Sequence, residues 1–399
     1  MMRQGTSDNV ETAEGLIERA RALAPILAQR APQAERDAKI PDETIADFQK
    51  AGFFRVLQPK RYGGYEMDPD VFYGIQMALA EGCMSSAWVY GVVAVHNWQI
   101  ALFDERAQEE VWGRDSTVLT SSTYMPVGKV TEVDGGFRLS GHWGFSSGSE
   151  HCDWVLLGAL VRPKDSDGAP EYRTFLLPRA DYRIVRNWDV MGLRGTGSHD
   201  IVVEDAFVPE YRTHKAIDGF ACDSPGNRVN TAPLYRLPFA QIFVRAVSTG
   251  SIGALQGAIN LFLQSAPARV SSNTGQKTTE DTGAQLACAD AQAAVDEMKA
   301  VLQRNFSVMM KAADEGQPLP VKTRVQYRYH SAAVAERSAA HVSRLLRYCG
   351  GRGIYLSNPL TRVFLDVHAA RSHVANNVDP FARNYGGMLL GRDNADFFV

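Results

Sequence analysis

Residues 129–148 read KVTEVDGGFRLSGHWGFSSG. Up to Ser140, apolar and β-branched side chains alternate with polar ones on both sides of Asp134-Gly135-Gly136. An Asp-Gly pair between alternating runs is typical of a β-hairpin. Further short runs of apolar and β-branched residues follow at 154–161, 172–177 and 201–203. The sequence therefore predicts a β domain over residues 116–212.

The residues on either side of this β region have the period of helices. Helical spacing extends from residue 8 to about 112 and returns in three long segments, 240–264, 282–313 and 321–349. Because strands do not alternate with helices, a βαβ nucleotide-binding fold is excluded. We expect a mainly α, α+β fold of three domains: an N-terminal helical domain (1–115), a middle β-barrel-like domain (116–212), and a C-terminal four-helix bundle (213–399) that starts with a long polar loop at 213–238.

The composition excludes several classes of protein. The chain has 399 residues, 45% of them hydrophobic, and a formal net charge of −3. No basic stripe indicates a nucleic-acid partner. The five cysteines are scattered without metal-ligand spacing, so we expect reduced thiols, no metal site and a cytoplasmic location. Residues 1–9 are polar and do not look like a signal peptide.

One apolar stretch, residues 83–103, could be mistaken for a membrane span. It carries no full charge, but it contains His96, Asn97 and Gln99. Such groups are costly in hydrocarbon. We therefore expect a buried helix pair that lines a pocket, and no membrane association.

Four motifs occur in the order that is found in one large family of flavoproteins. They are GFF…P…YGG at 52–64, GHWGFSSG at 141–148, MGLRGTGS at 191–198 and VEDAFVP at 203–209. With these motifs the chain resembles the acyl-CoA dehydrogenase fold over nearly its whole length. Within that fold it is most similar to the oxygenase components of two-component flavin monooxygenases, such as the p-hydroxyphenylacetate and seco-steroid phenol hydroxylases. The features closest to that branch are GVVAVHNW at 91–98, Ser146-Ser147-Gly148, and His373 followed by NNVDP at 376–380.

The resemblance implies a set of cofactors and partners. Reduced FMN or FAD would come from a separate NAD(P)H:flavin reductase, and O2 would be the co-substrate. A small aromatic substrate and a homotetramer built around the C-terminal bundle are also implied. Where acyl-CoA dehydrogenases carry Arg-x-x-Phe-Gly for a neighbouring FAD, residues 268–276 read ARVSSNTGQ. The missing Phe-Gly fits a flavin that comes and goes, FMN more than FAD.

The segment 364–377, FLDVHAARSHVANN, resembles the last helix of an acyl-CoA dehydrogenase. Where that family has its glutamate base, this chain has Val374, which cannot take a proton. The neighbouring His373 can, and the resemblance implies that it contacts the substrate. A neutral imidazole could accept the proton of a phenol or stabilise the phenolate. We treat His368 as structural.

Ser147 is implied to lie against flavin N5. A flavin C4a-hydroperoxide collapses when the N5 proton is lost, and a hydroxyl that accepts from N5–H would hold that proton in place. Ser146 takes this role if the register is off by one, and Phe145 would lie against the isoalloxazine or the substrate. The alternative is that these serines are ordinary turn residues.

Other site residues follow from the same resemblance. Flavin contacts are expected from five polar side chains: Ser121, Ser122, Arg194, Thr196 and Ser198. Hairpin glycines would explain the run around Arg194 nearly as well. His96 is a candidate catalytic and substrate-binding residue, and Trp98 and Asn377 are candidate substrate contacts.

The sequence thus predicts the oxygenase component of a two-component flavin-dependent monooxygenase that hydroxylates a phenolic substrate through a C4a-hydroperoxyflavin. One alternative is an oxygenase of the same fold that acts on an indole, sulfur or nitrogen and does not need His373. Another is an acyl-CoA dehydrogenase with a displaced base, against which Val374 argues.

Overall fold

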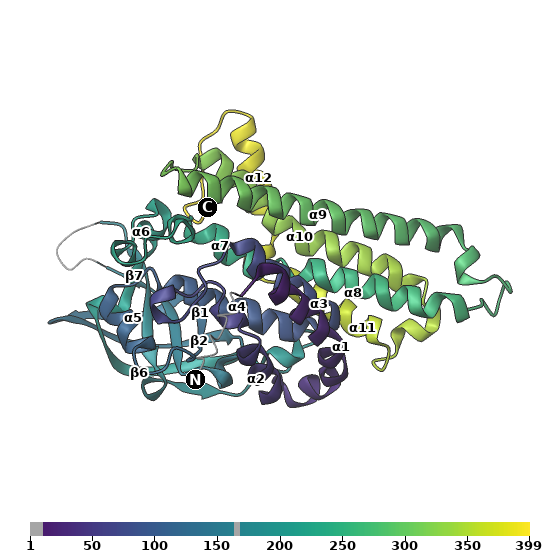
Figure 1. Ribbon diagram of the computed structural model, residues 1–399, viewed down its shortest axis with the longest axis horizontal. Helices are drawn as coiled ribbons and strands as arrows, with labels where there is room; N and C mark the ends of the chain where they lie inside the picture. Colours follow the sequence, from purple (N-terminus) through teal and green to yellow (C-terminus); the bar gives the residue numbers. More distant parts are fainter. Residues whose placement is uncertain (1–10, 163–167) are drawn as a thin grey trace, which may run out of the picture.

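The computed structural model describes residues 11–162 and 168–399, so the expectation for residues 1–9 lies outside the described residues. Helices come first along the chain, then a sheet, then further helices (Figure 1). The first helices are α1 (Ala13–Asp37), α2 (Asp42–Lys50), α3 (Pro69–Gly82), α4 (Met84–Ile100) and α5 (Glu105–Trp112). The strands are β1 (Thr120–Val133), β2 (Gly136–Ser146), β3 (Trp154–Val161), β4 (Glu171–Pro178), β5 (Arg183–Val185), β6 (His199–Pro209) and β7 (Thr213–Lys215). The later helices are α6 (Ala216–Ala221), α7 (Phe239–Ala246), α8 (Gly250–Ser265), α9 (Thr282–Asp314), α10 (Val321–Arg347), α11 (Pro359–Arg371) and α12 (Val378–Leu389).

Helix α4 connects the three parts of the molecule. Every residue of α4 is buried, and the helix packs against β1, α7 and α8. A helix that is apolar all round lies in the interior of a protein rather than on its surface. The expectation of two helices over residues 83–103 is wrong, because the single helix α4 spans nearly all of that stretch. Its few polar side chains are held inside the protein.

The described strands form one seven-stranded sheet in the order β5-β6-β2-β1-β3-β4-β7. The predicted hairpin is confirmed: Lys129 pairs with Ser140 and Val133 with Gly136, and Gly135 takes the left-handed conformation with φ 74° that the turn requires. The long strand β1 pairs with β2 along one half and with β3 along the other. The sheet thereby bends around its own apolar core, which includes Trp143 and Phe175.

The long helices α8, α9, α10 and α11 extend away from the sheet as a bundle (Figure 1). The stretch Phe239–Ala268 is long and apolar enough to cross a membrane by length and composition, but 94% of its most apolar window is buried inside the protein. It is a core segment. The single helix expected over 240–264 is two helices, since α7 ends at Ala246 and α8 starts at Gly250.

Two further expectations need correction. Residues 213–238 are not an irregular loop, because they contain β7, α6 and two short 3-10 turns. The helix expected through 364–377 ends at Arg371, and α12 follows it. His373 has extended φ and ψ of −66° and 138° and lies in the break between the two helices, just before the 3-10 turn η12 (Val374–Asn376).

Candidate active site

The turn after β2 brings Ser147 to an edge of the buried interior. Phe145, two residues earlier, has φ 67°, which is rare for a bulky side chain, and its ring is 65% exposed. Gly148 has φ 69°, and a Cβ on it would lie 2.8 Å from Val89 of α4. Strain of this kind persists where the surrounding structure fixes it, and it is frequent at functional sites. Close packing against α4 therefore fixes the position of Ser147.

A continuous chain of hydrogen bonds passes through the Ser147 hydroxyl. The indole Nε1 of Trp88 donates to Ser147 Oγ at 3.2 Å. The Oγ atoms of Ser147 and Ser198 are 2.7 Å apart, and Ser198 Oγ is 2.7 Å from Thr196 Oγ1. Thr196 Oγ1 donates to the Leu193 carbonyl at 2.9 Å. The structure thus joins three of the predicted residues, Ser147, Thr196 and Ser198, in one buried network.

The direction of these hydrogen bonds follows from counting protons. Each hydroxyl has one proton to donate. A carbonyl only accepts, so the Thr196 proton points to Leu193 O. Ser198 must then donate to Thr196, and Ser147 must donate to Ser198. The Ser147 oxygen has no proton left, so it presents itself to any further neighbour as an acceptor.

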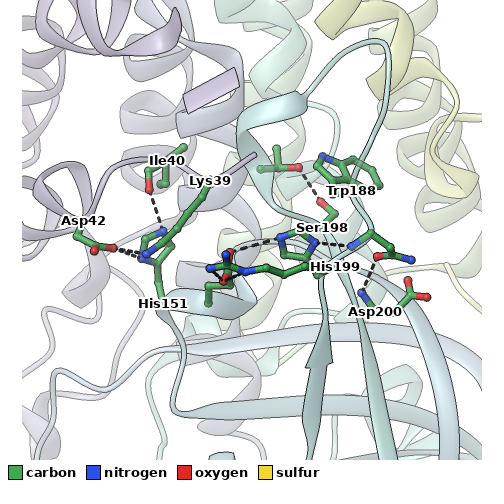
Figure 2. Close-up of polar contacts among 12 residues, drawn as sticks. Lys39, Ile40, Asp42, His151, Trp188, Ser198, His199 and Asp200 are labelled. Atoms are coloured by element: carbon green, nitrogen blue, oxygen red, sulfur yellow. Dashed lines mark hydrogen bonds and ion pairs between the residues drawn. The ribbon is translucent and has the colours of Figure 1, made fainter. Parts of the chain in front are cut away.

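The loop that carries Thr196 and Ser198 joins β5 to β6 and includes the 3-10 turn η5 (Arg194–Thr196). Figure 2 shows Ser198 and His199 extending in different directions from the start of β6. His199 accepts from the Asn187 N–H at 3.2 Å and lies 3.4 Å from the carboxylate of Glu150. On the same loop, the Trp188 indole donates to the Leu193 carbonyl at 3.0 Å. These contacts hold both ends and the middle of the loop.

His373 lies beside this network. Its ring is edge-on to Trp88, with ring centroids 5.7 Å apart. Its Nδ1 accepts the Ala375 N–H at 3.1 Å, so the proton of the neutral ring is on Nε2. Burial and the nearby Arg328 lower the pKa of His373 to about 4. At neutral pH the Nε2–H of His373 is therefore a hydrogen-bond donor, which suits a phenolate stabiliser better than a base.

His96 differs from His373 because its free ring nitrogen accepts a hydrogen bond, whereas that of His373 donates one. It is fully buried on α4, and burial lowers its pKa to about 3. The Tyr124 hydroxyl donates to Gln99 Oε1, so it accepts from the His96 Nδ1–H at 3.3 Å. The His96 Nε2 atom then carries a lone pair, and it is buried with no hydrogen-bond partner among the described residues. It could accept a hydrogen bond from a substrate.

The remaining predicted residues lie outside the Ser147 network. Ser146 and Ser121 are fully buried and bond one another at 3.2 Å, while Ser122 is half-buried. Arg194 is exposed and donates to the Val190 carbonyl at 3.1 Å. Trp98 is only 1% exposed, and its indole donates to the Leu234 carbonyl at 2.7 Å. Asn377 is exposed.

An aromatic cluster adjoins Tyr124 on the side of α7. Phe239 and Phe243 are stacked with centroids 6.1 Å apart, and Tyr124 meets Phe243 edge-on at 4.6 Å. Phe398, close to the end of the chain, packs on Phe239 at 5.8 Å. A cavity of about 20 Å³ remains between this cluster, α6 and residues 397–399, so the space is largely filled.

Trp88 and Tyr124 were not among the site residues predicted from the sequence. Trp88 links Ser147 to His373, and Tyr124 sets the proton position on His96. A signal for Trp88 was present, because an indole N–H inside an uncharged apolar run needs an acceptor. Tyr124 lies two residues after Ser122 in the same strand, but the sequence does not tell which face of the strand it occupies.

The profile of the acyl-CoA dehydrogenase N-terminal domain matches residues 11–115, and that of the C-terminal domain matches residues 246–378. The chain therefore belongs to the acyl-CoA dehydrogenase family. It is 37% identical over 96% of its length to the oxygenase subunit HsaA of a flavin-dependent monooxygenase of Rhodococcus jostii, covering 100% of that protein. It is 30% identical over 95% of its length to the oxygenase component of p-hydroxyphenylacetate 3-hydroxylase of Acinetobacter baumannii, covering 89% of that protein.

Two solved structures show the same fold along the chain. The crystal structure of 3-HSA hydroxylase from Rhodococcus sp. RHA1 has a TM-score of 0.92 at 36% identity, covering 96% of this chain and 99% of that one. The structure of XiaF from Streptomyces in complex with FADH2 and glycerol has a TM-score of 0.88 at 26% identity, covering 96% and 97%. The expected fold class is confirmed, and so is the resemblance to two-component oxygenases.

Proposed function

We propose that this chain is the oxygenase component of a two-component flavin-dependent monooxygenase that hydroxylates a phenolic ring. The observation that carries the proposal is the Ser147 oxygen, whose proton is directed to Ser198 in an oriented hydrogen-bond chain, so that it can only accept from a further partner. The similarity to oxygenase subunits over nearly the whole chain supports the same activity.

The residues around Ser147 fit a reduced flavin. A flat ring with N–H groups needs an acceptor at its polar atoms and apolar contacts on its faces. Ser147 offers the acceptor, while Phe145 and Met191 are 65% and 56% exposed and each lies two residues from a member of the network. When bound, reduced flavin supplies the electrons that activate O2. Ser147 then accepts a hydrogen bond from N5–H and keeps that proton in place.

We assign both histidines to the phenolic oxygen, one as hydrogen-bond acceptor and the other as donor. His96 Nε2, with its free lone pair, accepts from the phenol O–H, and His373 Nε2–H donates to the oxygen as negative charge develops on it. Both rings are neutral near pH 7, since burial lowers the pKa of each. A donor aimed at a developing oxyanion lowers the barrier most when water is excluded. Trp98 and Asn377 stay candidate substrate contacts.

The wider arrangement is part of the same proposal. The relatives are named as oxygenase subunits or components, which implies a second component, and a separate NAD(P)H:flavin reductase fits that place. Reduced FMN or FAD binds with contacts from Ser121, Ser122, Ser146, Arg194, Thr196 and Ser198. O2 is the co-substrate. The chain works as a cytoplasmic homotetramer whose domains are bounded near residues 115 and 212.

Two assays test this function. The purified chain mixed with NADH alone should not consume it, whereas chemically reduced FMN or FAD with O2 and a phenol should give a hydroxylated product. Steady oxidation of NADH by the chain without a reductase would contradict the two-component assignment. Bleaching of bound oxidised flavin by an acyl-CoA would favour the dehydrogenase alternative.

A further inference from the structure

Asp366 is a buried carboxyl that the proposed chemistry does not use. It lies on α11 between apolar neighbours and is only 2% exposed. Its Oδ1 accepts the backbone N–H of Leu193 at 2.6 Å, across 173 residues of sequence. Burying a carboxyl is costly unless it is hydrogen-bonded. Its position on α11 therefore indicates a specific function for this contact with the β5–β6 loop.

The contact holds Leu193 in an unusual backbone conformation. Leu193 has φ 55° and ψ 32°, a left-handed region that is unfavourable for leucine. The adjoining Gly192 is pressed against α11, because a Cβ there would lie 2.1 Å from the Leu365 carbonyl. The Asp366 hydrogen bond and this close approach together hold the backbone of Gly192 and the N–H of Leu193 against α11. Without them, the strained conformation would relax.

The Leu193 carbonyl is the final acceptor of the chain that reaches Ser147. Thr196 donates to this carbonyl, Ser198 to Thr196, and Ser147 to Ser198. The orientation of every hydroxyl in the chain depends on an acceptor at that point. If the Leu193 carbonyl moved away, Thr196 could donate to Ser198, and Ser147 could then keep its own proton on the side of the flavin.

We propose that Asp366 is a positioning residue for oxygen activation, which sets the proton direction at Ser147 by anchoring Leu193 on α11. The proposal rests on the proposed role of Ser147 as the acceptor for flavin N5–H. Asp366 lies 219 positions after Ser147 in the sequence and in a different domain from the turn that carries Ser147. The N5–H acceptor would exist only while the β5–β6 loop is docked on the bundle.

Three variants separate this role from general packing. Asp366→Ala removes the acceptor for the Leu193 N–H, while Asp366→Asn keeps a side-chain oxygen in the same place. Thr361→Val is the matched control, since Thr361 is buried on the same helix and donates to the Gly353 carbonyl at 2.5 Å, away from the β5–β6 loop. If Asp366→Ala does not fold, Gly192→Ala tests the same docking with Asp366 intact.

The first readout is hydrogen exchange in the flavin-free protein. The Leu193 amide should exchange slowly in the wild type and at least tenfold faster in Asp366→Ala or Gly192→Ala. Asp366→Asn and Thr361→Val should keep most of the protection. An unchanged Leu193 amide in both Asp366→Ala and Gly192→Ala would overturn the proposal, because the contact would then not hold the loop.

The second readout is the hydrogen peroxide released per reduced FMN consumed in the presence of a phenol. Asp366→Ala should release several-fold more peroxide, as Ser147→Ala should, and Asp366→Asn should be close to the wild type. If Ser147→Ala releases more peroxide and Asp366→Ala does not, the positioning role is overturned while the proposed function stands. If Ser147→Ala has no effect either, the proposed role of Ser147 fails together with this one.

Discussion

The Ser147 oxygen decides whether oxygen is transferred to the substrate or released as hydrogen peroxide. Its proton is directed to Ser198, so only a lone pair remains for a flavin N–H. In Ser147→Ala we expect O2 consumption to continue with more peroxide released per turnover. Loss of one such hydrogen bond costs about 1–3 kcal/mol, or roughly ten- to hundredfold in the lifetime of the oxygenating species.

A peroxide assay with reduced FMN and a phenol measures this effect. Ser149→Ala is the control, because Ser149 is buried two residues away and its hydroxyl has no partner among the described residues. Equal coupling in Ser147→Ala and Ser149→Ala would mean that Ser147 is a turn residue.

His373 separates the phenol hypothesis from its alternatives. His373→Ala removes an Nε2–H donor near Trp88, so hydroxylation of a phenol should slow while consumption of reduced flavin by O2 continues. Loss of a donor aimed at a developing oxyanion costs about 10²–10³-fold in rate. Full hydroxylation by the variant would instead favour an indole or heteroatom substrate.

The pH profile adds an independent check on His373. An unperturbed histidine would titrate near pH 6.5. Because burial and Arg328 lower the pKa of His373 to about 4, its ring stays neutral from pH 5.5 upwards. We expect no ionisation of His373 between pH 6 and 8 in the rate of hydroxylation, measured for the wild type and for His373→Gln. A wild-type step near pH 6.5 that the variant lacks would contradict this.

At the scale of elements, the turn between α11 and α12 depends on one of two neighbouring asparagines. Asn376 is buried, and its amide donates to the Val247 and Ala370 carbonyls at 2.9 Å each. Asn376→Ala should lower the free energy of unfolding by about 1–3 kcal/mol, since it removes the donor to the Val247 carbonyl and one of the donors to the Ala370 carbonyl, which keeps the His373 N–H. Asn377→Ala, at an exposed position, should be nearly neutral. Urea midpoints measure both changes, and equal midpoints would contradict the assignment.

Elements with a strong local signal were predictable from the sequence. The Asp134-Gly135 turn specifies its hairpin because this turn needs a residue in the left-handed conformation, which glycine adopts easily. The turn also places Lys129 opposite Ser140. The break at His373 was not predictable, because the helical period of residues 364–377 continues past Arg371, where α11 ends. Asp366 and Trp88 were missed for a related reason: their partners lie 173 and 59 residues away in sequence.

At the scale of the whole molecule, burial of titratable side chains makes stability depend on pH. Burial lowers the pKa of eight histidines, to about 3 for His96 and to about 4 for His214, His330 and His373, and also lowers it for His151, His199, His341 and His368. Burial raises the pKa of four carboxyls among the described residues, to about 6 for Asp70 and about 7 for Asp366, and also raises it for Glu81 and Asp218. The two groups act on stability in opposite directions.

The sign follows from which state binds more protons. Between pH 6.5 and 4 the unfolded chain protonates these histidines and the folded chain does not, so stability falls as the pH falls. Over pH 7 to 4 the folded carboxyls keep protons that the unfolded ones lose, which works the other way. Because the histidines outnumber the carboxyls, we expect a lower urea midpoint at pH 5 than at pH 7, at constant ionic strength. Asp366→Asn, which removes one opposing carboxyl, should make the fall steeper, and a midpoint that rises towards pH 5 would show that the carboxyls dominate.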